Sequence, residues 1–227
     1  GPRPPRRAGT RALIVASSIA AVVLLIAGII VAVNVSGSRS YAELPTCRQL
    51  LGDLADDIPG MDRPTVDGQR VDEDDAYGHY DGEAESGVEC NVEDPDRDDV
   101  PYVVHVNAFL YDHEDERGLS DLHHEMADEF ESYEDGSVED EHEDYRMLEW
   151  EETTIGDGGI LAVQEYVGGS GSDENHRTAY GLFLTGNASV SYSYELEERE
   201  DEEEAMDFVR SFGGDLERQL RSEGEFV

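Results

Sequence analysis

The sequence contains no lysine, so all 16 of its basic residues are Arg, against 55 Asp and Glu. The formal net charge is -39 at pH 7. Five of the Arg residues precede residue 41, whereas every acidic residue follows it. Because phosphate binding needs a basic surface, this imbalance excludes a main domain that binds nucleic acid. It also disfavours direct docking of that domain on anionic lipid.

Motifs of nucleophilic and nucleotide chemistry are missing as well. Ser170 and Ser172 lie in GGSGS, which is not the Gly-x-Ser-x-Gly elbow of hydrolases. The glycines of 156–159 lack the strand–loop–helix context of a phosphate-binding loop and its Lys, and they predict a turn between strands. We therefore expect no catalytic residue and no cofactor.

Metal motifs also fail at their ligand positions. Residues 94–98 begin like a calcium loop, but Asp99 stands where Gly is needed and His105 where Glu is needed. His123 and His124 have no second His four residues later, so a zinc-protease motif is absent. Acidic clusters at 72–75, 112–116, 139–144 and 201–204 leave loose Ca²⁺ binding open, but a solvated acidic surface is the simpler interpretation. We expect no specific metal site.

One long apolar segment predicts the membrane topology. Residues 12–35 carry no charge, and a helix of that length spans a bilayer core of about 30 Å. A cleaved signal peptide is the alternative, but its apolar region is shorter, about 7–15 residues. Four Arg residues within 1–11 predict a cytoplasmic N-terminus and an extracytoplasmic 36–227. The Pro/Arg-rich start at Gly1 indicates a trimmed start or a missing cytoplasmic part.

The two cysteines agree with this topology. Cys47 and Cys90 are the only pair in a region expected to lie in an oxidising space, and we predict that they form a disulfide. Two free thiols and a two-cysteine metal site are the alternatives. The spacing is not Cys-x-x-Cys, which makes zinc binding a poor interpretation.

Apolar periodicity divides the region after the apolar segment into elements. Residues 36–45 are expected to be a polar spacer, and residues 59–87 an exposed loop. Helices are predicted at 46–58, 119–133 and 202–221, and strands at 88–92, 101–111, 145–151, 160–167, 178–184 and 188–195. Gly213 and Gly214 are expected to break or kink the last helix. The hairpin-rich order predicts an α+β domain, an antiparallel sheet with helices mainly on one face, preceded by a single transmembrane helix.

Several of these segments resemble a family of bacterial proteins. LPTCRQLL near the membrane, the strand with Cys90, IGDGGILAV, GNASVSYSY and the closing amphipathic helix carry the resemblance. The chain resembles the secreted or membrane-tethered sensor-like domains of actinobacteria, which include lipoproteins of unknown function and the extracytoplasmic sensor domains of some Ser/Thr kinases. Two features depart from that pattern: no lipid-accepting Cys follows the apolar segment, and there is a single Cys pair. The resemblance supplies no catalytic residue.

The strand at 101–111 supplies the candidate ligand-facing residues. One side of its alternation is fully apolar, and the other holds His105, Asn107, Phe109 and Tyr111. A groove lined by tyrosines is one interpretation, with the four nearby candidates Tyr166, Tyr180, Tyr192 and Tyr194. The alternative is that most of these tyrosines complete the core with their hydroxyls at its edge.

The sequence therefore predicts a non-enzymatic, membrane-anchored extracytoplasmic domain with a sensory or binding role. Its expected partners are the membrane through residues 12–35 and a cationic protein, an ion or a wall-derived ligand. Two alternatives stay open, a surface protein whose acidity only maintains solubility in salt and an enzyme with an unrecognised site. The sequon at Asn187 falls in a predicted hairpin, so we interpret it as a chance occurrence.

Overall fold

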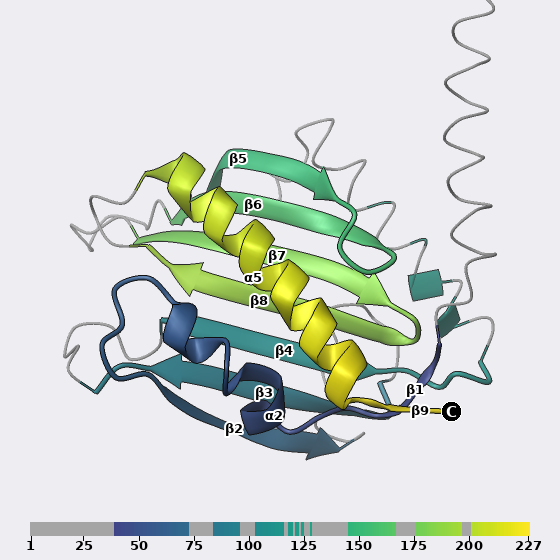
Figure 1. The fold of residues 1–227 in the computed structure, drawn as a ribbon. Helices are drawn as coiled ribbons and strands as arrows, with labels where there is room; N and C mark the ends of the chain where they lie inside the picture. Colours follow the sequence, from purple (N-terminus) through teal and green to yellow (C-terminus); the bar gives the residue numbers. More distant parts are fainter. Residues whose placement is uncertain are drawn as a thin grey trace, which may run out of the picture. The chain divides into compact units, whose positions relative to one another are not determined.

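The fold was determined as a computed structural model that describes residues 39–72, 84–95, 103–115, 118–119, 121–122, 124, 128, 145–166, 176–196 and 201–227. Residues 39–227 form one compact unit (Figure 1). None of the helices in the described ranges is long and apolar enough to cross a bilayer. The span predicted at 12–35 lies outside the described residues.

A seven-stranded antiparallel sheet forms the centre of this unit. Its spatial order is β2-β3-β4-β8-β7-β6-β5. The strands are β2 (Thr65–Asp72), β3 (Ser86–Glu93), β4 (Val104–Leu110), β5 (Tyr145–Thr153), β6 (Gly158–Tyr166), β7 (His176–Thr185) and β8 (Ala188–Glu195). Two meanders, β2–β4 and β5–β8, therefore meet where β4 pairs with β8. This arrangement confirms the α+β class.

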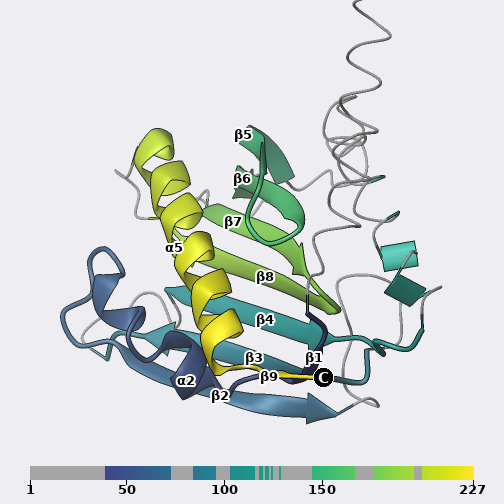
Figure 2. The same ribbon diagram turned by 45° about the vertical axis from the view of Figure 1, so that its right-hand side comes forward.

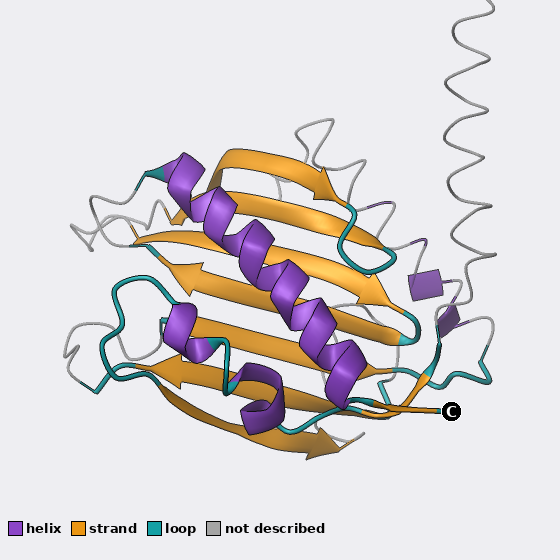
Figure 3. Cartoon of the chain, viewed as in Figure 1, coloured by secondary structure: helices purple, strands orange, loops and turns teal. Residues whose placement is uncertain are grey.

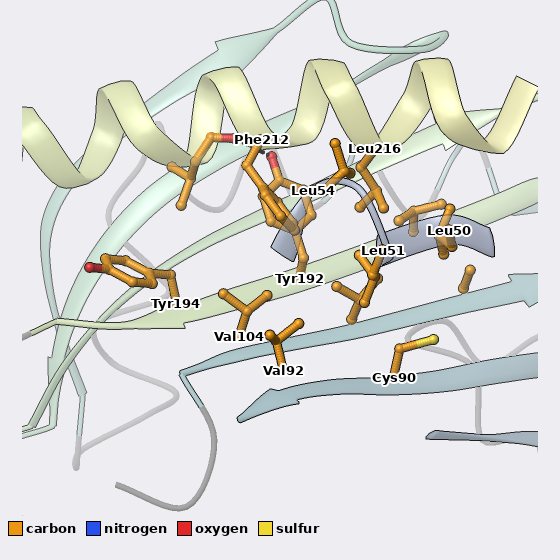
Figure 4. Close-up of a cluster of buried hydrophobic side chains, with 14 of the residues drawn as sticks. Leu50, Leu51, Leu54, Cys90, Val92, Val104, Tyr192, Tyr194, Phe212 and Leu216 are labelled. Carbon is orange, nitrogen blue, oxygen red and sulfur yellow. Dashed lines mark hydrogen bonds between the residues drawn. The ribbon is translucent and has the colours of Figure 1, made fainter. Parts of the chain in front are cut away.

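Three helical elements cover one face of the sheet. The C-terminal helix α5 (Glu202–Glu223) runs diagonally across it, beside the short helix α2 (Cys47–Leu51) and the 3-10 turn η1 (Ala55–Asp57), as Figures 2 and 3 show. Alternate residues of the strands point into this layer. The resulting core contains Leu50, Leu51, Val92, Val104, Tyr192, Phe212 and Leu216, all buried (Figure 4).

Helix α5 is continuous through Gly213 and Gly214, where the sequence had predicted a break or kink. Gly213 is buried against the ring of Tyr192, and a Cβ built there would lie 2.0 Å from the Tyr192 hydroxyl oxygen. That hydroxyl donates a hydrogen bond to the Val209 carbonyl at 2.8 Å. Gly213 is therefore needed for close packing between helix and sheet rather than for flexibility.

A small second sheet joins the beginning and the end of the folded unit. Strand β1 (Tyr41–Glu43) pairs with β9 (Glu225–Phe226), and Tyr41 stacks on Phe226 with ring centroids 4.8 Å apart. The buried Asn187 side chain accepts from the Tyr41 amide at 2.7 Å and donates to the Tyr111 carbonyl at 2.6 Å. Residues 41–44 are consequently part of the fold and not the expected spacer, with Tyr41 and Leu44 almost fully buried.

Two further expectations need correction. The predicted loop at 59–87 contains β2, an edge strand whose residues are mostly exposed and polar, so its alternation is weak. The predicted helix 46–58 is split into α2 and η1. Its capping box at Thr46 and Gln49 is present, but after Gly52 the hydrogen bonds run to the residue three positions back, from Leu54 to Leu51.

The helix predicted at 119–133 is described at only a few of its residues. Leu119, Asp121, Leu122, His124 and Asp128 are helical, within the helix predicted at 119–133, and Gly118 directly before them is helical too. Leu122 is buried and Leu119 packs beside it against Phe109, Leu182 and Leu184. These residues lie on the sheet face opposite α5, because Phe109 alternates with the core-facing Ala108 and Leu110.

Candidate functional site

The predicted disulfide is confirmed. Cys47 and Cys90 are bonded, with their Cα atoms 5.4 Å apart, and the bond ties the first residue of α2 to the middle of β3. Gly68 on β2 makes room for it, because a Cβ at that position would lie 2.4 Å from the Cys47 sulfur. A buried structural disulfide is typical of oxidising compartments, which supports an extracytoplasmic location.

The four candidate ligand-facing residues all lie on the face opposite α5, three of them on β4 and Tyr111 directly after it. Phe109 and Tyr111 are each 5% exposed and belong to the apolar cluster under Leu122. His105 and Asn107 are half-buried nearer the other end of the strand. The structure therefore separates the set into a covered apolar pair and a more open polar pair.

The two polar residues differ in their hydrogen bonding. The His105 Nδ1 atom is within hydrogen-bond distance of the Asn91 Oδ1 atom on β3. If Nδ1 carries the proton, as this amide oxygen favours, Nε2 of the neutral ring is left as an acceptor. Asn107 Oδ1 is excluded from solvent, yet no partner among the described residues donates to it. A buried acceptor without a donor costs about 1–3 kcal/mol, so its presence calls for an explanation.

Strand register places His105 in a line of side chains that crosses the sheet. His105 is directly opposite Ser193 on β8, and Ser193 is opposite Tyr180 on β7. Tyr180 is opposite Ala162 on β6, and Ala162 is opposite Trp150 on β5. We call these five residues the cross-sheet row. Directly paired residues share a face, so the whole row lies opposite α5.

The tyrosines proposed as a groove do not share one face. Tyr192 and Tyr194 point into the core under α5 and are nearly fully buried, as Figure 4 shows. Tyr180 lies on the opposite face, two strands from Trp150. The groove of four tyrosines is therefore not formed. Trp150 and Ser193 were not among the predicted site residues, because their alignment with His105 depends on register between distant strands.

Asp94 of the calcium-like segment and Asn187 of the sequon both make hydrogen bonds that hold the fold together. Asp94 is buried and accepts from the Asp62 amide at 3.0 Å. Asn187, which begins the sequon, is 1% exposed with its amide engaged, so it is inaccessible in the folded domain. Within the described ranges, no three His, Cys, Asp or Glu residues gather as metal ligands. Asp96, Asp98, His79, His123 and His142 lie outside those ranges.

One carboxyl group on the face of the cross-sheet row has a shifted pKa. Glu195, at the end of β8, has a raised pKa chiefly because it is partly buried, although Thr178 donates a hydrogen bond to it at 3.3 Å. On the other face, the Arg210 guanidinium has a raised pKa, first because it donates a hydrogen bond to Glu151 at 2.8 Å. Arg210 is exposed and ties α5 to β5, which makes it a surface link and not a site residue.

Comparison with known protein families matched no family model to the chain. Comparison with the curated proteins found no match either.

Proposed function

We propose that the chain is a single-pass membrane protein whose folded unit is a non-enzymatic, extracytoplasmic binding domain. The segment 12–35 anchors it, and the disulfide between Cys47 and Cys90 supports an oxidising surrounding. The sheet face opposite α5 is the binding surface in this proposal. Sensing follows if binding there is communicated through the anchor, in keeping with the resemblance to sensor-like domains.

The observation that carries the proposal is the polar content of that face. A sheet face buried by its own protein is normally apolar, as is the face under α5. The opposite face also buries an apolar cluster that includes Phe109, Leu182 and Leu184. Beside that cluster, however, it carries half-buried His105, Asn107 and Ser193. Of these, Asn107 keeps a buried acceptor without a described partner. Ligand-binding surfaces retain such groups because an apolar replacement cannot supply hydrogen bonds to a ligand.

The anchor and its orientation are tested in cells that express the full chain with a tag at each end. We expect the protein to resist alkaline extraction from membranes, and protease added to spheroplasts to remove the C-terminal tag only. The matched control replaces Leu24 and Leu25 by Arg, which costs about 2.5–3.5 kcal/mol for each charge at a helix centre. This variant should leave the membrane. Protease removal of the N-terminal tag would contradict the topology.

The binding role is tested through Trp150, the one Trp of the sequence. Because Trp150 lies on the proposed surface, bound material should shield it from the neutral quencher acrylamide. We expect a cell-envelope extract to reduce quenching in the full chain and a cytosolic extract to leave it unchanged. Equal quenching with and without envelope extract would refute binding at this face.

A further inference from the structure

Ring side chains and small side chains alternate along the cross-sheet row. The order across neighbouring strands is Trp150, Ala162, Tyr180, Ser193 and His105. Neighbouring strands are about 4.8 Å apart, so the backbone positions of successive ring residues are about 10 Å apart. That interval is about the length of a disaccharide. A linear sugar chain running across the strands would therefore meet a ring at every second sugar.

The aromatic rings have apolar support from the sheet. Trp150 and Tyr180 pack against Ile160 and Ala162 in a small cluster that is separate from the core under α5. Both rings are half-buried, so part of each remains accessible. A sugar ring presents one face of C–H groups, which gains dispersion energy against an aromatic surface held in this way.

Neutral hydrogen-bonding groups stand between and beside the rings. Ser193 supplies a hydroxyl that both donates and accepts, and His105 supplies a ring nitrogen beyond its contact with Asn91. Asn107 lies opposite Ser191 in the adjacent row, next to Glu89 of β3. Sugars carry hydroxyls at the rim of each ring, and these hydroxyls pair with amide, hydroxyl and imidazole groups.

Charge narrows the ligand class further. The sequence holds 55 acidic residues, yet none of the five residues of the cross-sheet row is acidic. The carboxylates that share this face, among them Glu152 on β5, Glu89 on β3 and Glu195 on β8, flank the row. A cationic ligand would be drawn to these flanking carboxylates and not to the row itself. An anionic ligand would be repelled by the net charge of -39. The row is thus suited to an uncharged ligand.

We infer that the cross-sheet row binds a linear, uncharged oligosaccharide, with Trp150 and Tyr180 stacking on alternate sugars and Ser193 and His105 bonding their hydroxyls. This inference rests on the proposed function, because it names the ligand class of the same surface.

The test titrates the full chain, in phosphocholine micelles that carry no sugar headgroup, with hexamers of N-acetylglucosamine and of glucose. We expect at least one hexamer to shift the Trp150 emission and to release heat on binding, and a dimer of the same sugar to bind at least about tenfold more weakly because it reaches one ring only. Affinity for a neutral ligand should change less than about twofold between low salt and about 1 M NaCl, where charge interactions are screened.

A pair of matched variants locates the binding. Ser193→Glu places a charge between Tyr180 and His105 and should weaken binding at least about tenfold. Ser211→Glu adds the same charge on the exposed surface of α5 and should change affinity less than about twofold. Tyr180→Ala, which adds no charge, provides a second variant with Trp150 intact, and it should also weaken binding about tenfold. Near-ultraviolet circular dichroism verifies that each variant is folded.

Three results would overturn the inference. The first is that neither hexamer changes the Trp150 emission or releases heat on binding. The others are that folded Ser193→Glu and Tyr180→Ala bind with the affinity of the parent chain, or that Ser211→Glu weakens binding as much as Ser193→Glu does. The envelope-extract experiment separates this failure from that of the proposed function. If the extract shields Trp150 while neither hexamer binds, the binding role stands and the oligosaccharide is excluded.

Discussion

Replacing Gly214 of α5 by Ala should stabilise the protein, whereas the same change at its neighbour Gly213 should destabilise it. A Cβ at Gly214 meets nothing within 4 Å. A Cβ at Gly213 would lie 2.0 Å from the hydroxyl oxygen of Tyr192, 2.7 Å from its Cζ atom and 3.0 Å from the Ile155 side chain. The two changes are chemically identical and differ only in what the new methyl group contacts.

The magnitudes follow from helix propensity and packing. Gly to Ala in a helix interior gains about 1 kcal/mol, which is the full expected effect at position 214. At position 213 the same gain is opposed by overpacking of about 1–3 kcal/mol. Displacement of Tyr192 also strains its 2.8 Å hydrogen bond to Val209, worth about 1 kcal/mol. The net loss is about 2 kcal/mol, so the two variants should differ by about 3 kcal/mol.

Thermal unfolding of the full chain with the disulfide intact measures this difference. For a folded unit of this size, about 3 kcal/mol corresponds to about 6–12 °C in Tm. Tyr192→Phe removes the hydroxyl that makes the closest contact, so the cost of Gly213→Ala should be smaller in that background. The reasoning fails if both Ala variants shift Tm in the same direction by similar amounts, or if Tyr192→Phe leaves the cost unchanged.

Three further predictions concern the disulfide, Glu195 and Asn187. Replacing both Cys47 and Cys90 by Ala should reduce the free energy of unfolding in urea by up to about 4 kcal/mol, and an unchanged midpoint would contradict this. Burial raises the pKa of Glu195, so ionisation of this carboxyl costs stability as the pH rises. Glu195→Gln should therefore raise Tm near neutral pH but not below pH 4.5. The increase should exceed any change in Tm caused by the control variant Glu114→Gln, which alters an exposed residue. Asn187→Ala leaves backbone groups of Tyr41 unpaired and should cost about 2 kcal/mol or more, with faster amide exchange at Tyr41; protection equal to that of the parent chain would refute it.

Most of the sheet was predictable from alternation. Residues 188–195 alternate Ala, Val and Tyr with Ser, and the structure contains β8 over the same residues. In β4 the apolar Val104 and Val106 face α5 while His105 and Asn107 face away, as the pattern predicts. Both strands lie in the interior of the sheet with one apolar face, which is the situation in which a period of two is strongest.

The elements that escaped prediction lack that signal for physical reasons. β2 is an edge strand with little to bury, and β1 and β9 are too short to show a period. Gly213 was interpreted as a helix breaker because sequence alone does not show the Tyr192 ring beside it. The cross-sheet row depends on the register of five strands, and no local pattern encodes which residue of β5 stands in line with His105 of β4.

The order of strands also determines how the chain reaches this structure. Each meander is built from neighbours in sequence, so its hairpins close short loops. The ladder between β4 and β8 is different, because it pairs Leu110 with Ala188 across the intervening β5–β7. Closing so long a loop delays its contacts, and α5 gains its complete docking surface only afterwards. We expect β5–β8 to form early in refolding and the β4–β8 ladder to limit the rate, so changes at Val106 or Val190 should slow folding more than changes at Ile160.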